Sequence, residues 1–355
     1  MNNHSNQAYD ALALFSGGLD SILAIKLIQA QGLRALGLHF ISPFFGHPEK
    51  ITLWEETYGL SILPVDVSRE FISMFIDGPR YGLGKILNPC VDCKILMLTA
   101  AKKMLGQHQA SFIISGEVLG QRPMSQRIDT LNIIRRDADV KNILVRSLSA
   151  RHLPPTDPEK KGIILREKLG AISGRGRKDQ IRLAKKFNID PIPTPAGGCL
   201  LTEKESARRY IPLLEKKKDP QPDDFYLANT GRQLWNRNYW LCIGRNKEDN
   251  ERLTSLATDK DYIINLKFFP GPLGLLRPID DASLPEEILE SACEVLSRFS
   301  PKARQSNRKV DLVVQKEDWE KEFLIWPGQQ QSLKWQEPVW KKPSYPDKTE
   351  DSHTL

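Results

Sequence analysis

The chain has little of what marks membrane and secreted proteins. In its 355 residues, no uninterrupted apolar stretch reaches the roughly eighteen residues of a membrane span, and the opening "MNNHSNQAYD" lacks the charged-then-apolar layout of a signal peptide. Only five cysteines are present, an odd and sparse set that excludes the dense disulfide framework of a small secreted domain. We therefore expect a cytoplasmic protein of two or three domains with no membrane partner.

A glycine-containing loop separates two apolar runs near the N-terminus. Residues 11–27 read "ALALFSGGLDSILAIKL"; the short first run favours a buried strand, and the second, which starts at Asp20, is typical of an amphipathic helix. The two glycines let the backbone approach a ligand, and the start of a helix presents free N–H groups to an anion. We expect a phosphate site to which Ser16 and Ser21 add hydroxyl donors; a helix merely capped by Ser16 or Asp20 is the alternative. No lysine follows the glycines, which excludes the Walker loop.

The segment "FSGGLDS" resembles the pyrophosphate loop of the ATP pyrophosphatase, or PP-loop, family. This resemblance implies cleavage of ATP between its α and β phosphates, with Ser16, Gly17, Gly18 and Ser21 around the pyrophosphate. It also implies that Asp20 orients Mg²⁺, because a hard cation that bridges phosphates usually recruits a carboxylate.

Strand-like and helix-like segments alternate after this loop. The strand-like segments are residues 33–40, 60–67, 110–118 and 142–149, and helical stretches such as 93–105 and 127–139 separate them. The alternation predicts an α/β fold, and the resemblance implies a parallel sheet of HUP/PP-loop type covered by helices on both faces. Ligands of such sheets bind beyond the carboxyl ends of the strands, where His39 and residues 115–117 should lie with the loop. By the resemblance, Gly116 lies against the adenosine.

The segment that follows, "GEVLGQRPMSQR", is rich in hydrogen-bond donors. Its position favours a clamp on ATP or substrate by Gln121, Arg122 and Gln126, with a solvated loop as the alternative. His152, which lies beside prolines, is expected to be structural.

Three cysteines lie at or near predicted helix starts. Cys90 and Cys93 stand one helical turn apart after Pro89, where a helix start is predicted to lower the pKa of a thiol, and Cys199 lies in an irregular loop before a further helix. Cys242 and Cys293 lie in apolar patterns and are predicted to be buried hydrophobes. Three thiolates that leave one position open suit an iron–sulfur cluster that binds an exogenous sulfide, whereas an inert reduced pair is the alternative for Cys90 and Cys93.

A PP-loop followed by C-x2-C and a distant third cysteine resembles the tRNA thiolation enzymes. The resemblance implies that ATP adenylates a base carbonyl oxygen, expected to be that of uridine, and that sulfur then displaces AMP. In cluster-dependent members, the counterparts of Cys90, Cys93 and Cys199 hold a 4Fe-4S cluster. In cluster-free members, the counterpart of Cys199 carries a persulfide and that of Cys90 resolves it. The presence of Cys93 favours the cluster, with sulfide or a sulfur-carrier protein as the donor.

Positive charge is concentrated in the middle of the chain. Residues 121–218 contain 23 Lys and Arg against 11 Asp and Glu, a net charge of +12, whereas the whole chain carries +7. A phosphodiester backbone favours such a segment near the chemistry, so we expect tRNA or another structured RNA as partner. The cluster at Arg175, Arg177 and Lys178 is one candidate contact.

The prolines and charges of "KKKDPQPDDF" predict a linker. We therefore place a PP-loop thiolation domain at residues 1–218, a smaller α+β domain at 222–328 and a disordered tail at 329–355. The smaller domain contains "GRNKEDNERL" and "FFPGPLGLL" and resembles the NFACT-R module, an RNA-binding domain.

Two other functions stay open from the sequence. One is PP-loop adenylation of a small molecule, and the other is a non-catalytic RNA-binding factor that retains the PP-loop as a scaffold. The intact Ser-Gly-Gly-x-Asp-Ser motif and the three cysteines favour the RNA sulfurtransferase over both.

Overall fold

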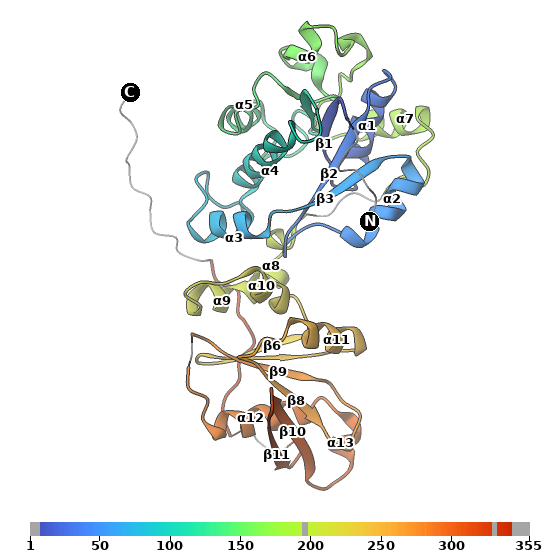
Figure 1. Cartoon of the computed structure of the whole chain (residues 1–355). Coiled ribbons are helices and arrows are strands. Elements are labelled where there is room, and N and C mark those ends of the chain that lie inside the picture. Colours follow the sequence, from blue (N-terminus) through green and yellow to red (C-terminus); the bar gives the residue numbers. More distant parts are fainter. Residues whose placement is uncertain (1–7, 194–197, 281, 329–331, 343–355) are drawn as a thin grey trace, which may run out of the picture. The chain divides into compact units, whose positions relative to one another are not determined.

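The computed structural model describes residues 8–193, 198–280, 282–328 and 332–342 (Figure 1). The chain divides into two compact units, Met1–Thr202 and Glu203–Leu355. This division falls before the boundary at residue 218 predicted from the linker-like composition. Residues 203–218 belong to the second unit because their side chains pack there: the Tyr210 ring lies 5.8 Å from that of Phe225. No helix within the described ranges is long and apolar enough to cross a membrane.

The first unit is built on a five-stranded parallel sheet in the order β3-β2-β1-β4-β5. Its strands are β1 (Ala11–Leu14), β2 (Ala35–Ile41), β3 (Ser61–Asp66), β4 (Phe112–Ile114) and β5 (Leu144–Val145). Its helices are α1 (Leu19–Gln29), α2 (Ile51–Tyr58), α3 (Ser68–Ile76), α4 (Cys90–Met104), α5 (Ile128–Asp137), α6 (Asp157–Lys160) and α7 (Lys178–Lys186). The strand order reverses at β1, so the carboxyl ends of β1 and β4 flank the position where such sheets bind ligands.

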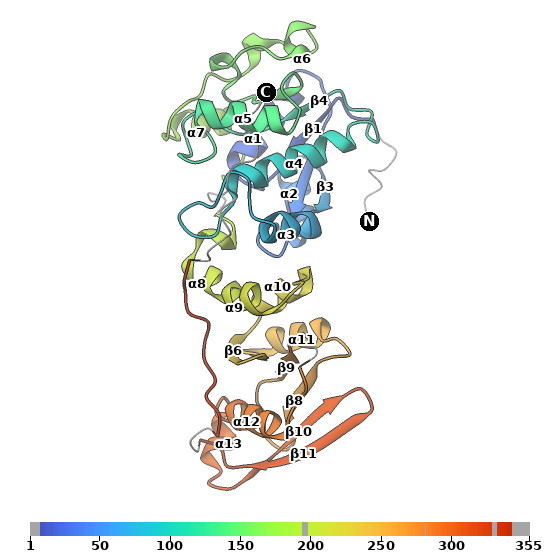
Figure 2. The same ribbon diagram turned by 90° about the vertical axis from the view of Figure 1, so that its left-hand side faces the viewer.

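Both faces of this sheet are covered, which explains why every residue of β1 is buried. Ala11 and Ala13 point into a core shared with α1, α2 and α7, whereas Leu12 and Leu14 point into a second core shared with α4 and α5. Figures 1 and 2 show these helices on opposite sides of the strands. The predicted parallel α/β fold of HUP/PP-loop type is confirmed.

The second unit contains a six-stranded antiparallel sheet in the order β11-β10-β8-β9-β7-β6. Its strands are β6 (Arg232–Asn236), β7 (Tyr239–Ile243), β8 (Tyr262–Leu266), β9 (Gly274–Pro278), β10 (Val310–Lys316) and β11 (Trp319–Ile325). Its helices are α8 (Lys204–Ala207), α9 (Ile211–Lys216), α10 (Pro222–Ala228), α11 (Lys247–Leu256), α12 (Glu286–Ser297) and α13 (Pro301–Gln305). The predicted α+β character of this part of the chain is confirmed.

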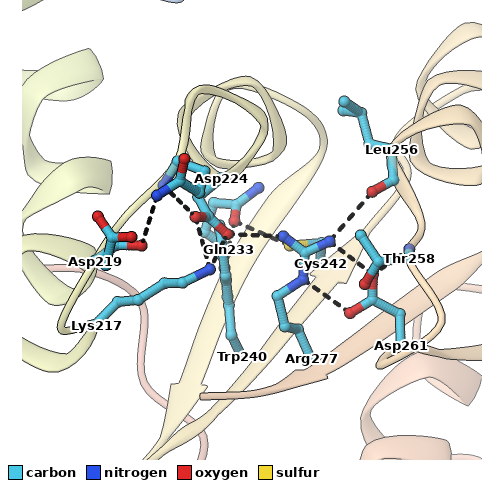
Figure 3. A network of polar contacts seen from close by, with 11 residues as sticks. Lys217, Asp219, Asp224, Gln233, Trp240, Cys242, Leu256, Thr258, Asp261 and Arg277 are labelled. Carbon is cyan, nitrogen blue, oxygen red and sulfur yellow. Dashed lines mark hydrogen bonds and ion pairs between the residues drawn. The ribbon is translucent and has the colours of Figure 1, made fainter. Parts of the chain in front are cut away.

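A buried ionic network fixes α10 and the loop before β8 to the sheet of this unit. The Arg277 guanidinium on β9 donates to Asp261 at 2.8 and 2.6 Å and to Asp224 at 2.9 Å, and Lys217 adds a second cation beside Asp224 (Figure 3). All three members of the central cluster are nearly inaccessible to water. Each charge is therefore paired, as burial requires.

Residues 332–342, within the tail predicted to be disordered, pack against the second unit. Trp335 is buried and its Nε1 donates to Ser291 Oγ at 3.1 Å, while Trp235 and Gln336 exchange backbone hydrogen bonds at 2.8 and 2.9 Å. The polar composition suggested disorder, but the buried indole provides enough apolar area to hold this segment.

Candidate active site

The loop between β1 and α1, residues 15–18, curves so that its backbone surrounds an open space, and we call this loop the cup. Gly17 adopts a left-handed conformation with φ 76°, and a Cβ at this position would lie 2.8 Å from Cη2 of Trp54, so only glycine fits. Gly18 is the N-cap of α1, and no side chain caps the helix. The capping alternative for Ser16 and Asp20 is therefore wrong, and the helix start remains suited to an external anion.

The two serines of the cup support its shape. Ser21 Oγ donates to the carbonyl oxygen of Gly18 at 2.7 Å, and the Ser16 N–H donates to Ser21 Oγ at 3.3 Å. Ser21 is buried and Ser16 is exposed. The serine pair therefore positions the loop, and the Ser16 hydroxyl lies at its open side.

Asp20 follows the cup in the first turn of α1. Its Oδ1 is buried and has no hydrogen-bond partner among the residues that the structure describes. Burial raises the pKa of this carboxyl, while a hydrogen bond from Gln121 and the charges of Arg177 and Arg122 act to lower it. An unpaired buried carboxylate oxygen beside a helix start suited to an anion fits a ligand of Mg²⁺.

Gly116 follows β4, on the other side of the reversal in strand order. A Cβ on Gly116 would lie 2.5 Å from the carbonyl oxygen of Asp20 and 2.9 Å from the Ser21 nitrogen. Glycine is required because the backbone after β4 lies directly against the first turn of α1. The adenosine contact of Gly116 stays a prediction.

Both ring nitrogens of His39 form hydrogen bonds to backbone atoms, one of them in Phe15, the residue after β1. Its ring is 2% exposed, Nδ1 donates to the Phe15 carbonyl oxygen at 3.2 Å, and Nε2 accepts from the His47 N–H at 2.7 Å. One ring nitrogen must donate and the other must accept, which is the pattern of the neutral imidazole. Burial lowers the pKa of His39, in agreement with a neutral ring.

A buried ion pair beside the cup has no simple signal in the sequence. Arg146 Nε donates to Glu117 Oε2 at 3.0 Å, and Ser115 Oγ donates to the same oxygen at 2.9 Å. Glu117 Oε1 has no partner within the described ranges. Burial acts to raise the pKa of Glu117, but the charges of Arg146 and Lys94 hold it below its usual range. Lys94 lies near the start of α4, the helix that begins at Cys90, and its charge thus acts on a carboxylate next to the cup.

The three residues predicted to clamp ATP or substrate have two different roles in the structure. The Gln126 side chain accepts a hydrogen bond from the Arg122 N–H at 3.1 Å and the Gln126 carbonyl accepts one from Gly120 at 2.7 Å, so Gln126 holds its own loop together. Gln121 and Arg122 act on Asp20. His152 Nε2 contacts the Ala171 carbonyl oxygen at 2.8 Å, a structural contact as expected.

Arg177 belongs to the neighbourhood of the cup. The Gly174 N–H donates to the Leu119 carbonyl oxygen at 2.7 Å, which holds the loop before α7 against the segment after β4. Arg177 Nε is buried without a hydrogen-bond partner, as are both polar atoms of the Gln180 side chain, within the part of the chain described. The Arg177 charge acts on Asp20, so Arg177 lies near the carboxylate whose Oδ1 is unpaired within the described ranges. The sequence pattern favoured an RNA contact for Arg177 and did not predict its position near Asp20.

The structure brings the Cys199 segment beside the start of α4. Cys90 is the first residue of α4 and accepts a hydrogen bond from Asn88 Nδ2 at 3.1 Å. The Leu87 N–H, three residues earlier, donates to the Leu201 carbonyl oxygen at 3.1 Å. Cys199 is itself fixed by Thr202, whose hydroxyl donates to its carbonyl oxygen at 2.7 Å.

The thiols differ from expectation in their acidity. Burial raises the pKa of Cys93 far above its usual range and that of Cys199 to about 11. The helix start was predicted to lower these values; for Cys93 this prediction is wrong, because loss of hydration outweighs the helix dipole and the nearby Lys94. The charges of Cys90 and Cys199 both act on Cys93, and that of Cys90 acts on Cys199, so the three thiols lie close enough to influence one another.

The three neighbouring thiols have the chemistry of iron–sulfur ligands, but they are not arranged as a metal site. Three mutually interacting thiols leave a fourth position open, which suits a 4Fe-4S cluster with one substitutable iron. Among the described residues, no group of three or more His, Cys, Asp or Glu side chains is arranged to hold a metal ion. Cys242 and Cys293 are buried in the second unit, in keeping with their expected hydrophobic role.

Comparisons with known proteins match both units. Residues 7–149 match the family model of the thiamine biosynthesis protein (ThiI), and residues 231–335 match that of the NFACT protein RNA binding domain. No curated protein matches the chain significantly.

Solved structures give distant similarities. The U34-tRNA thiolase NcsA from Methanococcus maripaludis with its 4Fe-4S cluster is 13% identical with a TM-score of 0.31, over 64% of this chain and 72% of that chain. A predicted tRNA methyltransferase subunit from Methanocaldococcus jannaschii is 13% identical with a TM-score of 0.32, over 50% of this chain and 75% of that chain. The C-terminal part of the fibronectin/fibrinogen-binding protein from Streptococcus suis is 13% identical with a TM-score of 0.25, over 67% and 86%.

The two family matches agree with the resemblances carried by "FSGGLDS" and by "GRNKEDNERL" with "FFPGPLGLL". The chain therefore contains one segment similar to the ThiI family and a second segment similar to the NFACT RNA binding domain.

Proposed function

We propose that the protein is an ATP-dependent RNA sulfurtransferase that replaces a base carbonyl oxygen, in tRNA and at uridine, with sulfur. The observation that carries this proposal is the occurrence in one unit of an uncapped PP-loop with an unpaired Asp20 Oδ1 and of three interacting thiols. The PP-loop with Asp20 suits ATP binding, and the three thiols suit sulfur transfer. The match of residues 231–335 to an RNA-binding domain supports RNA as the substrate.

The first step is adenylation. The base carbonyl oxygen attacks the α phosphorus of ATP and pyrophosphate leaves, so the oxygen becomes part of a good leaving group. The backbone N–H groups at the start of α1 bind the departing pyrophosphate. Asp20 would hold Mg²⁺, which would supply positive charge beside the phosphates. Arg177 and Arg122, whose charges reach Asp20, offset the negative charge of the phosphates.

The second step is transfer of sulfur. Sulfide attacks the activated base carbon, and AMP leaves with the original base oxygen, so no net oxidation occurs. A 4Fe-4S cluster held by Cys90, Cys93 and Cys199 would supply an iron with an open position for that sulfide. In the alternative, a Cys199 persulfide attacks the base and Cys90 then displaces the thiolated base from Cys199. That route leaves a Cys90–Cys199 disulfide, which an external dithiol must reduce.

ATP turnover tests the first step. Purified protein incubated with ATP, Mg²⁺ and tRNA should form AMP and pyrophosphate in equal amounts, and omission of tRNA should suppress both. AMP formation that does not depend on RNA would instead favour adenylation of a small molecule. RNA binding without any AMP formation would favour a non-catalytic factor.

The cysteines separate the two sulfur routes. Protein prepared without oxygen should be brown, and Cys93→Ala should lose iron and activity while the buried control Cys293→Ala keeps both. An active, iron-free Cys93→Ala variant that forms a Cys90–Cys199 disulfide after turnover would refute the cluster and leave RNA thiolation in place.

A further inference from the structure

One end of the antiparallel sheet combines exposed aromatic rings with unbalanced positive charge. The segment 298–309 contains five Lys and Arg and no Asp or Glu. The loop 267–273, between β8 and β9, presents Phe268 with 68% of its surface exposed, and Phe299, at the end of α12, is 36% exposed. Large exposed rings that coincide with concentrated charge mark a binding surface more often than a merely solvated one.

Hydrogen bonds hold these segments against each other. Ser300 Oγ donates to the Pro270 carbonyl oxygen at 2.7 Å, which joins the loop to the turn between α12 and α13. The Lys267 N–H donates to the Asp311 carbonyl oxygen at 3.0 Å, which joins the same loop to β10. The segments that carry the rings and the cations therefore lie side by side. We call their exposed side chains the aromatic-basic surface, which consists of Phe268, Phe299, Lys302, Arg304, Arg308 and Lys309.

Cations lie over the rings of this surface. The Arg232 guanidinium is 4.6 Å from the centroid of Phe299 and also donates to the Gly244 carbonyl oxygen at 3.3 Å. Lys267 Nζ is 5.5 Å from the centroid of Phe268 and also forms an ion pair with Glu322, so the unpaired positive charge of this surface comes from the segment 298–309. Each ring thus makes a cation–π contact, and the part of the ring that stays exposed can stack against another planar group.

The remaining cations are not neutralised by the protein. Lys302, Arg304 and Lys309 are exposed, and within the described ranges none of them forms an ion pair. Such side chains are suited to phosphates that approach from solvent.

We propose that the aromatic-basic surface binds unpaired nucleotides of RNA, with bases stacked on Phe268 and Phe299 and phosphates held by Arg304 and Lys309. Inside a duplex, neighbouring base pairs cover both faces of each base, so only splayed nucleotides can stack on these rings. The rings therefore favour a single-stranded segment over a helical one. This inference rests on the RNA partner proposed above and specifies which part of the RNA is recognised and where.

The test measures binding by the full-length protein to a fluorescent single-stranded RNA of about twelve nucleotides and to the same strand annealed to its complement. Phe268→Ala should weaken binding of the single strand about 5- to 100-fold and leave duplex binding unchanged. The double variant Arg304→Glu, Lys309→Glu should weaken both and lower the salt slope for the single strand by about 0.7 per lost phosphate contact.

Two controls lie elsewhere on the same unit. Trp319 is 42% exposed and pairs with Lys316, at the opposite end of β10 from Lys309, roughly 20 Å away. Lys247, on α11, has a side chain that is 90% exposed. Trp319→Ala and Lys247→Glu should bind both probes as the wild type does.

The outcomes separate this inference from the proposed function. If Phe268→Ala binds the single strand as tightly as Trp319→Ala does, or if the wild type binds duplex and single strand equally, the surface is not a stacking site. In either case RNA-dependent AMP formation would still support the sulfurtransferase. If the wild-type protein binds neither probe and forms AMP at the same rate with and without tRNA, both the proposed stacking site and the proposed RNA substrate are wrong.

Discussion

Gly116→Ala tests whether the close approach of β4 to α1 builds the active site. The added Cβ would lie 2.5 Å from the Asp20 carbonyl oxygen, 2.7 Å from its carbon and 2.9 Å from the Ser21 nitrogen. Ordinary contacts of a Cβ begin at 3.4 Å, so the gap must widen by about 0.9 Å, from 2.5 to 3.4 Å. All three atoms are backbone atoms, so no flexible side chain can move away. The start of α1, with Asp20 and the cup, must shift.

Two quantities should change together. Overpacking of this kind lowers the free energy of unfolding by about 1–3 kcal/mol. A displacement of about 1 Å in a reacting site lowers the rate on the order of 100-fold. We therefore expect a folded variant whose tRNA-dependent AMP formation is about 100-fold slower, measured with radiolabelled ATP beside urea unfolding.

Gly106→Ala is the matched control in the same unit. A Cβ at Gly106 meets nothing within 4 Å, and Gly106 is not among the glycines with positive φ, so this variant should be neutral or stabilised by about 0.4–1 kcal/mol. If Gly116→Ala forms AMP as fast as Gly106→Ala, the nucleotide does not bind at the junction of β1, β4 and α1.

Three further predictions concern buried ionisable side chains. Asp20→Asn should abolish AMP formation without lowering the melting temperature, because burial outweighs the Gln121 hydrogen bond and the arginine charges and raises the pKa of Asp20, so the fold does not stabilise its charged form; retained turnover would remove the Mg²⁺ role. Burial lowers the pKa of His39, so its contribution to stability is present above about pH 6.5 and is lost as the pH falls towards its folded value. Urea unfolding at pH 5 and pH 7.5 should therefore show a smaller difference for His39→Gln than for the wild type, and equal differences would contradict a neutral buried ring. Arg277→Ala leaves two buried carboxylates, Asp224 and Asp261, without their shared cation and should destabilise the second unit by about 3–5 kcal/mol, measured by tryptophan fluorescence; a loss below about 1 kcal/mol would contradict the network.

Local patterns were sufficient to predict the fold of the first unit. Short apolar runs alternating with amphipathic stretches indicated a parallel sheet, and β1 is buried throughout because helices cover both faces. The same patterns indicated that the segment after β4 lies near the cup, since both follow strands on either side of the reversal in strand order.

What the sequence could not predict depends on contacts between distant segments. The position of Arg177 near Asp20 depends on how the loop before α7 packs against Leu119, and the pairing of Glu117 with Arg146 joins two strand ends. The raised pKa of Cys93 depends on burial, which overrides the local effect of a helix start. The packing of Trp335 depends on a cavity formed by other parts of the second unit.

We infer that this chain transfers sulfur to RNA in a reaction driven by ATP. The most direct measurement is mass spectrometry of nucleosides from tRNA incubated without oxygen with the protein, ATP, Mg²⁺ and sulfide labelled with a heavy sulfur isotope. We expect a thiolated uridine that carries the label, requires ATP, and disappears with Cys199→Ser but not with Cys293→Ser. Unmodified tRNA in a reaction that forms AMP and pyrophosphate would contradict it.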